Sequence, residues 1–191
     1  RDYTWAKEHL KDMESAVIKE TQLRVGYVIL ANKDGKHTKR TLNTILNQQL
    51  KPSKIAVVFF NEDERIKWFH KEIKHIPIER AKIDIVNVID KDDKNHLIDS
   101  GCRRLTETNF ITVLDGFFRL DSNFASNLDN QINTHLRKIA LVDNIGDGFA
   151  VQTDIYKLLG GSFEEPIRDK IRNLAKIQGL EDMIINYDEV C

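Results

Sequence analysis

Short apolar runs alternate with longer amphipathic stretches along this chain, and this alternation restricts the folds open to it. The apolar runs are rich in β-branched residues, which is typical of strands buried on both faces of a sheet. Strands are expected at residues 25–31, 55–60, 83–89, 110–114 and 139–142. Helices are expected between them at 38–50, 62–74, 94–107 and 122–135. The spacing predicts an α/β fold with a mostly parallel sheet flanked by helices.

The composition of the chain indicates how large a core it can bury and which classes of protein it does not resemble. With 191 residues, of which 41% are hydrophobic, the chain can bury a sizeable core. We expect an amphipathic helix within residues 1–22 and one domain over residues 23–191. The 29 basic and 30 acidic residues almost cancel, so the sequence predicts no nucleic-acid groove. It contains no apolar stretch near the roughly 20 residues that span a bilayer, and its two cysteines favour a reducing, cytoplasmic location.

Several common catalytic motifs are missing from the sequence. It has no GxGxxG, no GxxxxGK[ST], no GxSxG and no HExxH motif. In open α/β sheets, ligands bind beyond the carboxyl ends of the strands. That rule draws attention to the residues that follow four expected strands, namely 31–34, 60–63, 90–94 and 115–118.

The order of several segments is informative beyond this pattern. Residues 41–48 read T-L-N-T-I-L-N-Q, and residues 52–58 read P-S-K-I-A-V-V. Later come F-I-T-V-L-D at 110–115, G-G-S-F-E at 160–164 and G-L-E-D at 179–182. Together these segments resemble family-two glycosyltransferases, in which a helix, a turn and a strand precede a D-x-D region, a G-G-F-x-E segment and an E-D element. The resemblance implies a fold of the GT-A type.

The resemblance also implies an activity, the inverting transfer of a sugar from a nucleotide-diphosphate donor to an acceptor hydroxyl. A Mg²⁺ or Mn²⁺ ion would neutralise the departing diphosphate, and Asp115 would bind that metal. Asp182 would be the general base, with Glu181 beside it as a second catalytic candidate. The nucleotide-binding positions implied by the same motifs are Ala31, Asn32, Asn61 and Asp115.

A second function stays open because the sequence departs from the family at two places. Phe59 and Phe60 stand where the family has the first aspartates of a D-D-G-S segment. Phe117 and Phe118 stand where it has further carboxylates, and we expect their rings to pack in the core or at an interface. A phenyl ring cannot coordinate a cation. The alternative is therefore a catalytically inactive, glycosyltransferase-like module that binds a protein partner.

Overall fold

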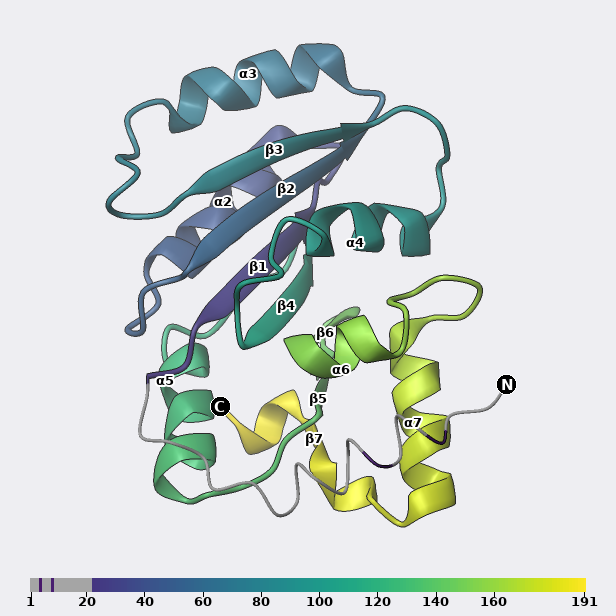
Figure 1. Ribbon diagram of the computed structural model, residues 1–191. Helices are drawn as coiled ribbons and strands as arrows, with labels where there is room; N and C mark the ends of the chain where they lie inside the picture. The colour runs from purple at the N-terminus through teal and green to yellow at the C-terminus, as the bar shows by residue number, and fades with distance from the viewer. Residues whose placement is uncertain (1–3, 5–7, 9–21) are drawn as a thin grey trace.

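The computed structural model of the chain describes Thr4, Glu8 and residues 22–191. The amphipathic helix expected over residues 1–22 lies almost wholly outside the described residues. One sheet of seven strands, in the order β3-β2-β1-β4-β6-β5-β7, runs through the described part (Figure 1). The strands are β1 (Val25–Leu30), β2 (Lys54–Phe60), β3 (Ile83–Val88), β4 (Phe110–Asp115), β5 (Leu141–Ile145), β6 (Gly148–Gln152) and β7 (Ile184–Asn186).

Helices connect most of these strands. They are α2 (Gly35–Leu46), α3 (Asp63–Ile73), α4 (Lys94–Cys102), α5 (Phe124–Asp129), α6 (Thr153–Leu158) and α7 (Ile167–Gln178). Shorter turns are η1 (Asn130–Thr134), η2 (Glu181–Met183) and η3 (Tyr187–Glu189). The strands β1 to β4 are mutually parallel, and β7 is parallel to β5. Among the described strands, only β6 runs antiparallel to both of its neighbours, and it follows β5 through a tight turn. The mostly parallel sheet with flanking helices confirms the predicted α/β class.

Two apolar layers cover the two faces of the sheet. Along β1, Tyr27 and Ile29 face a core that includes residues of α2, α3 and α5. Val28 faces the opposite core, which includes residues of α4, α6 and α7. Side chains alternate between the faces of a strand, so both faces of β1 are buried. Helices therefore cover both faces of the sheet (Figure 1).

Several helix boundaries differ from the expected ones for local reasons. The helix α2 begins earlier, at Gly35, because the Asp34 side chain caps it by accepting from the Lys36 nitrogen. The helix α4 ends at Cys102, and turns at Arg103 and Arg104 follow it. The helix expected at 122–135 is α5 followed by the π-helical turn η1. Beyond residue 142 no element is expected, yet β6, α6, α7 and β7 lie there.

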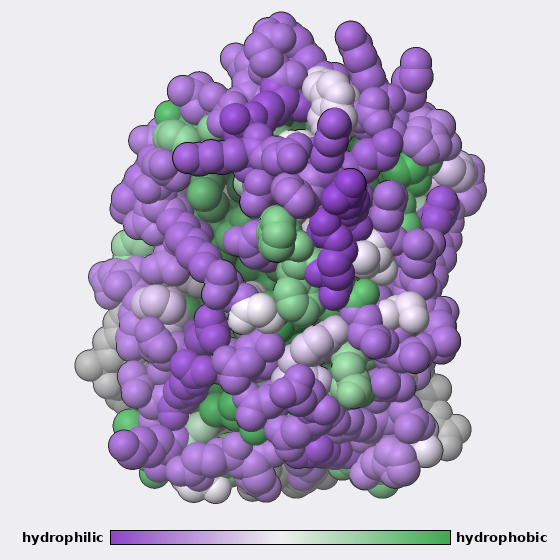
Figure 2. Space-filling view, turned by 180° about the vertical axis from the view of Figure 1, so that it is seen from behind, coloured by the Kyte–Doolittle hydropathy of each residue, from purple (hydrophilic) through white to green (hydrophobic). Residues whose placement is uncertain are grey.

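The outer surface agrees with the balanced composition. Seen from the side opposite to Figure 1, the molecule is mostly hydrophilic, and hydrophobic residues show chiefly in recesses near its middle (Figure 2). In the part of the chain that the structure describes, no helix has the length and apolar character needed to cross a membrane.

Candidate functional site

The direction of the chain through the sheet changes between β1 and β4. From β1 the chain adds β2 and then β3 on one side, and afterwards returns to place β4 on the other side. The crossover helices α2 and α4 consequently pack on opposite faces of the sheet. A crevice opens where neighbouring crossovers diverge in this way, and such switch points are where open α/β sheets bind their ligands.

Asp115 and Asn32 lie at this switch point. Leu30 pairs with Asp115 at the last register position of β1 and β4, and the Gly116 nitrogen donates to the Leu30 carbonyl at 2.8 Å. Asn32 follows directly, and its backbone nitrogen donates to Thr38 Oγ1 at 2.9 Å. The two strand ends thus bring the backbones at Asn32 and Asp115 close to one another.

The other predicted nucleotide-binding positions lie at the same edge. The Ala31 nitrogen donates to the Val58 carbonyl of β2 at 2.9 Å. Asn61 follows β2, where its nitrogen donates to the Val88 carbonyl at 2.9 Å, and its φ of 46° is left-handed. Asparagine tolerates this conformation better than most residues. The structure therefore brings all four predicted positions to the carboxyl ends of three adjacent strands.

One oxygen of the Asp115 carboxylate makes a hydrogen bond within a local turn. Its Oδ1 accepts from the Phe117 nitrogen at 2.9 Å. Among the described residues, no group of three or more His, Cys, Asp or Glu side chains is arranged to hold a metal ion. Mg²⁺ and Mn²⁺ favour several oxygen ligands, which the phenylalanines after Asp115 cannot supply. The donor set at this position does not fit the divalent cation that the resemblance implies.

The two phenylalanines have different surroundings. Phe118 packs edge-on against Tyr187 with ring centroids 5.7 Å apart, and its carbonyl accepts from Thr41 Oγ1 at 2.8 Å. Phe117 is 58% exposed, its ring centroid lies 4.5 Å from that of His37, and Arg119 lies over it at 5.8 Å. The expected packing thus holds for Phe118, whereas Phe117 stands on the surface beside the switch point.

The two predicted catalytic residues are far from this edge. Glu181 and Asp182 lie in η2, directly before β7 begins. Because β7 is parallel to β5, and β5 points the same way as β4, residues that precede β7 lie at the amino edge of the sheet. Asp182 there lines a cavity with Arg137 and Lys138. The structure does not bring Asp182 and Asp115 together, and one active site cannot use both in the roles that the motifs implied.

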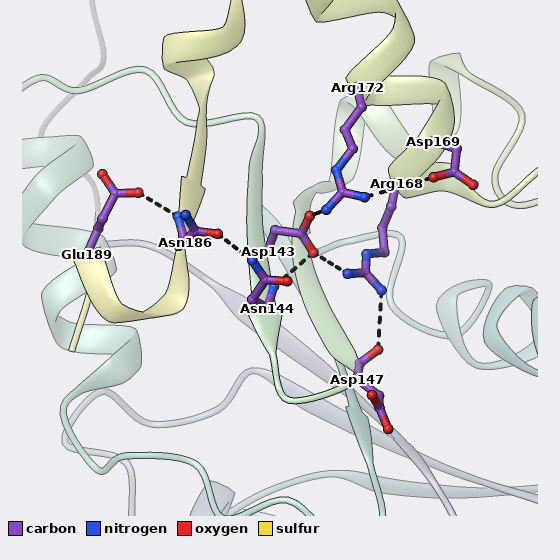
Figure 3. A network of polar contacts seen from close by, with 8 residues as sticks. All are labelled: Asp143, Asn144, Asp147, Arg168, Asp169, Arg172, Asn186 and Glu189. Carbon is purple, nitrogen blue, oxygen red and sulfur yellow. Dashed lines mark hydrogen bonds and ion pairs between the residues drawn. The ribbon is translucent and has the colours of Figure 1, made fainter.

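A network of ion pairs on the other side of β4 corresponds to none of the sequence motifs. Asp143 of β5 is 2% exposed, and two arginines of α7 contact its carboxylate (Figure 3). Arg168 Nη2 lies 2.5 Å from Asp143 Oδ1, and Arg172 contacts Oδ2. The Arg168 guanidinium also lies 5.7 Å from the ring centroid of Phe149. The helical spacing of the two arginines was visible in the sequence, but their shared partner lies in a distant strand.

This network borders a cavity of about 260 Å³ between the beginnings of α4 and α7. Its polar lining comes from both helices and from the loops beside them, and comprises Lys94, Asn95, Asp147, Ser162, Arg168, Asp169 and Arg172. Ser162 Oγ and Arg168 Nε are buried there without a hydrogen-bond partner in the described structure. Buried polar atoms in proteins are nearly always paired, so each of these two atoms has hydrogen-bonding capacity left for a water molecule or a polar ligand.

Solved structures with a similar arrangement come from glycosyltransferases. The mannosyltransferase PcManGT from Pyrobaculum calidifontis, solved with GDP-Man and Mn²⁺, matches with a TM-score of 0.56 and 12% identity, over 82% of this chain and 54% of that one. TarS from S. aureus matches with a TM-score of 0.55 and 8% identity, over 71% of this chain and 48% of that one. This chain has the GT-A glycosyltransferase fold.

The GT-A likeness concerns the fold alone, since the identities are low. A further structure of TarS, in complex with UDP-GlcNAc, matches with a TM-score of 0.52 and 10% identity, over 63% of this chain and 34% of that one. The chain spans about half the length of the first two solved structures. No protein-family model matches the sequence, and neither does any curated protein.

Proposed function

We propose that this chain binds a nucleotide-diphosphate sugar at the switch point between β1 and β4 and transfers the sugar, with inversion, to an acceptor hydroxyl. The observation that carries the proposal is the convergence of Asn32, Asn61 and Asp115 on the carboxyl ends of adjacent strands. The structural neighbours PcManGT and TarS were solved with GDP-Man and UDP-GlcNAc, which supports a donor of this class.

The side chains at the switch point suit a nucleoside. The Asn32 Oδ1 accepts from the Asp34 nitrogen at 2.9 Å, which holds the side chain in place and leaves its amide NH₂ to donate. The Asn61 amide offers one acceptor and two donors for the edge of a base. Asp115 has a second carboxylate oxygen, and an ionised carboxylate accepts from ribose hydroxyls.

Inverting transfer needs a base at the same edge as the donor. The acceptor oxygen forms a bond to the anomeric carbon while the bond from that carbon to the diphosphate breaks. The diphosphate leaves with the electron pair, and the hydroxyl proton passes to a base. The exposed carboxylates of Asp147 and Asp169 line the cavity beside β4, and we assign them as the candidates for that base. Asp182 is not a candidate in this proposal, because it lies at the opposite edge.

A second function has its own support. Phe117 and Phe118 occupy the positions after Asp115, and the described residues hold no acidic cluster that fits a metal. Both features suit a GT-A domain that keeps a ligand or partner site without catalysing transfer. The exposed ring of Phe117 would then belong to a contact with a protein partner.

Calorimetric titration separates these outcomes. UDP, GDP and CDP, and sugars attached to each, are titrated into the chain, and sugar release is followed with the same donors. Donor binding that weakens at least tenfold in Asp115→Asn supports the proposed site. Asp121→Asn is the matched control, because Asp121 Oδ1 accepts from the Asn123 nitrogen at 2.8 Å in the same type of turn. Binding without turnover supports the inactive module, and no binding at millimolar ligand rejects both donor-based proposals.

A further inference from the structure

Resting on the proposed function, we infer that the cavity lined by Lys94, Ser162 and Arg168 receives the diphosphate of the donor, and that these side chains bind it without a divalent cation. The fold is shared with a mannosyltransferase solved with Mn²⁺, whereas the residues around Asp115 do not fit such an ion. The negative charge of a departing diphosphate still needs a positive counterpart at this place.

The cavity lies on the correct side of the sheet for this role. Side chains alternate along β4, so Asp115 points to the same face as Val113, which belongs to the core beneath α4. Val113 pairs with Phe149 of β6, and the Arg168 guanidinium lies over the Phe149 ring. Two residues along a strand span about 7 Å, and neighbouring strands lie about 4.8 Å apart. A nucleoside diphosphate bound at Asp115 can therefore extend its phosphates into the cavity.

The lining offers unused donors. Ser162 is 2% exposed, and its hydroxyl has no hydrogen-bond partner among the described residues, although its backbone nitrogen donates to Asp99 Oδ1 at 2.8 Å. Arg168 Nε is likewise buried and unpaired. A guanidinium has five N–H donors in a fixed plane, and it suits the oxygen atoms of phosphates. Ser162 and Arg168 thus have hydrogen-bond donors left for a ligand.

The buried Asp143 orients Arg168 without cancelling the local positive charge. Its single negative charge is shared between Arg168 and Arg172, so the three side chains together keep one net positive charge (Figure 3). Lys94, at the beginning of α4, adds a third cation to the lining. Asp147 and Asp169 also line the cavity; like Lys94 they are exposed, so water screens the charges of all three, and the less exposed Arg168 carries the argument. Their carboxylates suit the hydroxyls of the sugar that the diphosphate carries.

The chemistry balances without a metal. When the bond between the anomeric carbon and the diphosphate oxygen breaks, that oxygen keeps both electrons. The N–H groups of Arg168 and the hydroxyl of Ser162 donate to the diphosphate oxygens, on which the negative charge increases. The acceptor gives its proton to a carboxylate, and no other reactant is consumed. Fixed donors of this kind stabilise a developing charge because they need little reorganisation.

Titration of UDP and GDP in the presence of EDTA, and separately with Mn²⁺, tests the inference. We expect nucleotide affinity in EDTA to lie within threefold of that with Mn²⁺, and Arg168→Gln to weaken it at least tenfold. Ser162→Ala is the sharper variant, because the hydroxyl has no partner to lose and folding should not suffer. It is expected to keep the stability of the wild type while weakening nucleotide binding three- to tenfold. Arg168→Lys, which keeps the charge, should restore part of the affinity.

Arg137→Gln is the control variant. It removes an arginine that is paired with Glu189 at 3.6 Å near the amino edge, and it should leave nucleotide binding unchanged. Nucleotide binding that appears with Mn²⁺ but not in EDTA overturns this inference and leaves the proposed function standing. Undiminished binding in Ser162→Ala and Arg168→Gln also overturns it. Absence of binding under both conditions overturns the proposed function itself.

Discussion

A Cβ atom built on Gly116 would lie 2.6 Å from the backbone nitrogen of Asn32 and 2.6 Å from the carbonyl oxygen of Leu30. Real Cβ atoms essentially never come so close to backbone atoms, and neither strand end can move aside alone, because the two are hydrogen-bonded. Glycine at position 116 is therefore what lets the ends of β1 and β4 meet at the switch point.

Replacing this glycine should harm both folding and the site. We expect Gly116→Ala to lower the free energy of unfolding by about 1–3 kcal/mol, the usual range for overpacking. It should also weaken nucleotide binding, because Asn32 and Asp115 would be pushed apart. Urea denaturation and nucleotide titration measure the two effects. Wild-type stability in the variant would show that the strand ends have more freedom than the structure indicates.

The buried carboxylate of Asp143 should matter greatly for stability. In Asp143→Asn the two arginines, whose side chains are 26% and 45% exposed, lose their shared negative partner. Water screens part of the charge left behind, so we expect a loss between the value for an exposed pair, about 1 kcal/mol, and that for a fully buried pair, about 3–5 kcal/mol. Asp169→Asn is the matched control, since Asp169 is exposed and lies 4.0 Å from Arg172. An exposed pair contributes at most about 1 kcal/mol, so the control should unfold nearly as the wild type does. Equal losses in both variants would contradict the assigned role of Asp143.

A pH-dependent effect is expected at Asp99 of α4. Burial raises the pKa of this carboxyl, and the hydrogen bond from the Ser162 nitrogen and the nearby Arg103 and Lys170 only partly oppose the shift. A carboxyl whose pKa is raised by folding stabilises the folded state at low pH, and this stability is lost as the pH rises through the folded-state pKa. Asp99→Asn does not titrate and keeps an oxygen that accepts from Ser162 and Tyr156.

The variant should therefore gain stability relative to the wild type as the pH rises. The unfolding free energy of the variant minus that of the wild type is smallest below the ordinary pKa of an aspartate. It increases as the pH rises and becomes constant above the raised pKa of Asp99. Urea denaturation of both proteins between pH 3 and pH 8, at about unit steps across the usual titration range, measures this difference. An advantage of the variant that shrinks with rising pH would show that the folded-state pKa of Asp99 is lowered instead.

Asp182 and Asp115 lie at opposite edges of the sheet, so replacing them should have different effects on binding and transfer. Because it lies at the amino edge, Asp182→Asn should leave nucleotide affinity and any sugar transfer within twofold of the wild type. Asp115→Asn should reduce both, because its carboxylate lies at the switch point. Titration and sugar-release assays on the two variants make the comparison directly. Loss of transfer in Asp182→Asn, with the fold intact, would refute the placement of the active site at the carboxyl edge.

The sequence was a good guide where local patterns determine structure. The β-branched runs predict the four parallel strands β1 to β4 to within a residue or so, because both faces of such strands are buried. The nucleotide-side positions follow from the same reasoning, since the end of a predicted strand also locates the residue after it. The strand ends and the parallel sheet locate the ranges 31–34 and 115–118, and the family resemblance selects Asn32 and Asp115 within them.

The C-terminal part was harder to predict for physical reasons. A G-L-E-D segment resembles a catalytic element letter by letter, but its letters do not reveal at which edge of the sheet it lies. That depends on the direction of β5 and β7, which is set by the hairpin between β5 and β6. The network around Asp143 depends on the docking of α7 onto β5, and such tertiary contacts leave no local periodicity to detect.

The central position of β1 also has a consequence for synthesis. Val25 and its neighbours pair with β2 on one side, but their other partner is the strand that begins at Phe110. While a ribosome makes the intervening residues, one side of an apolar strand stays without its hydrogen bonds. Open strand edges of this kind recruit other chains, and pairing across a long loop is slow. We therefore expect the nascent chain to be prone to association along this edge of β1 until residues 110–115 emerge.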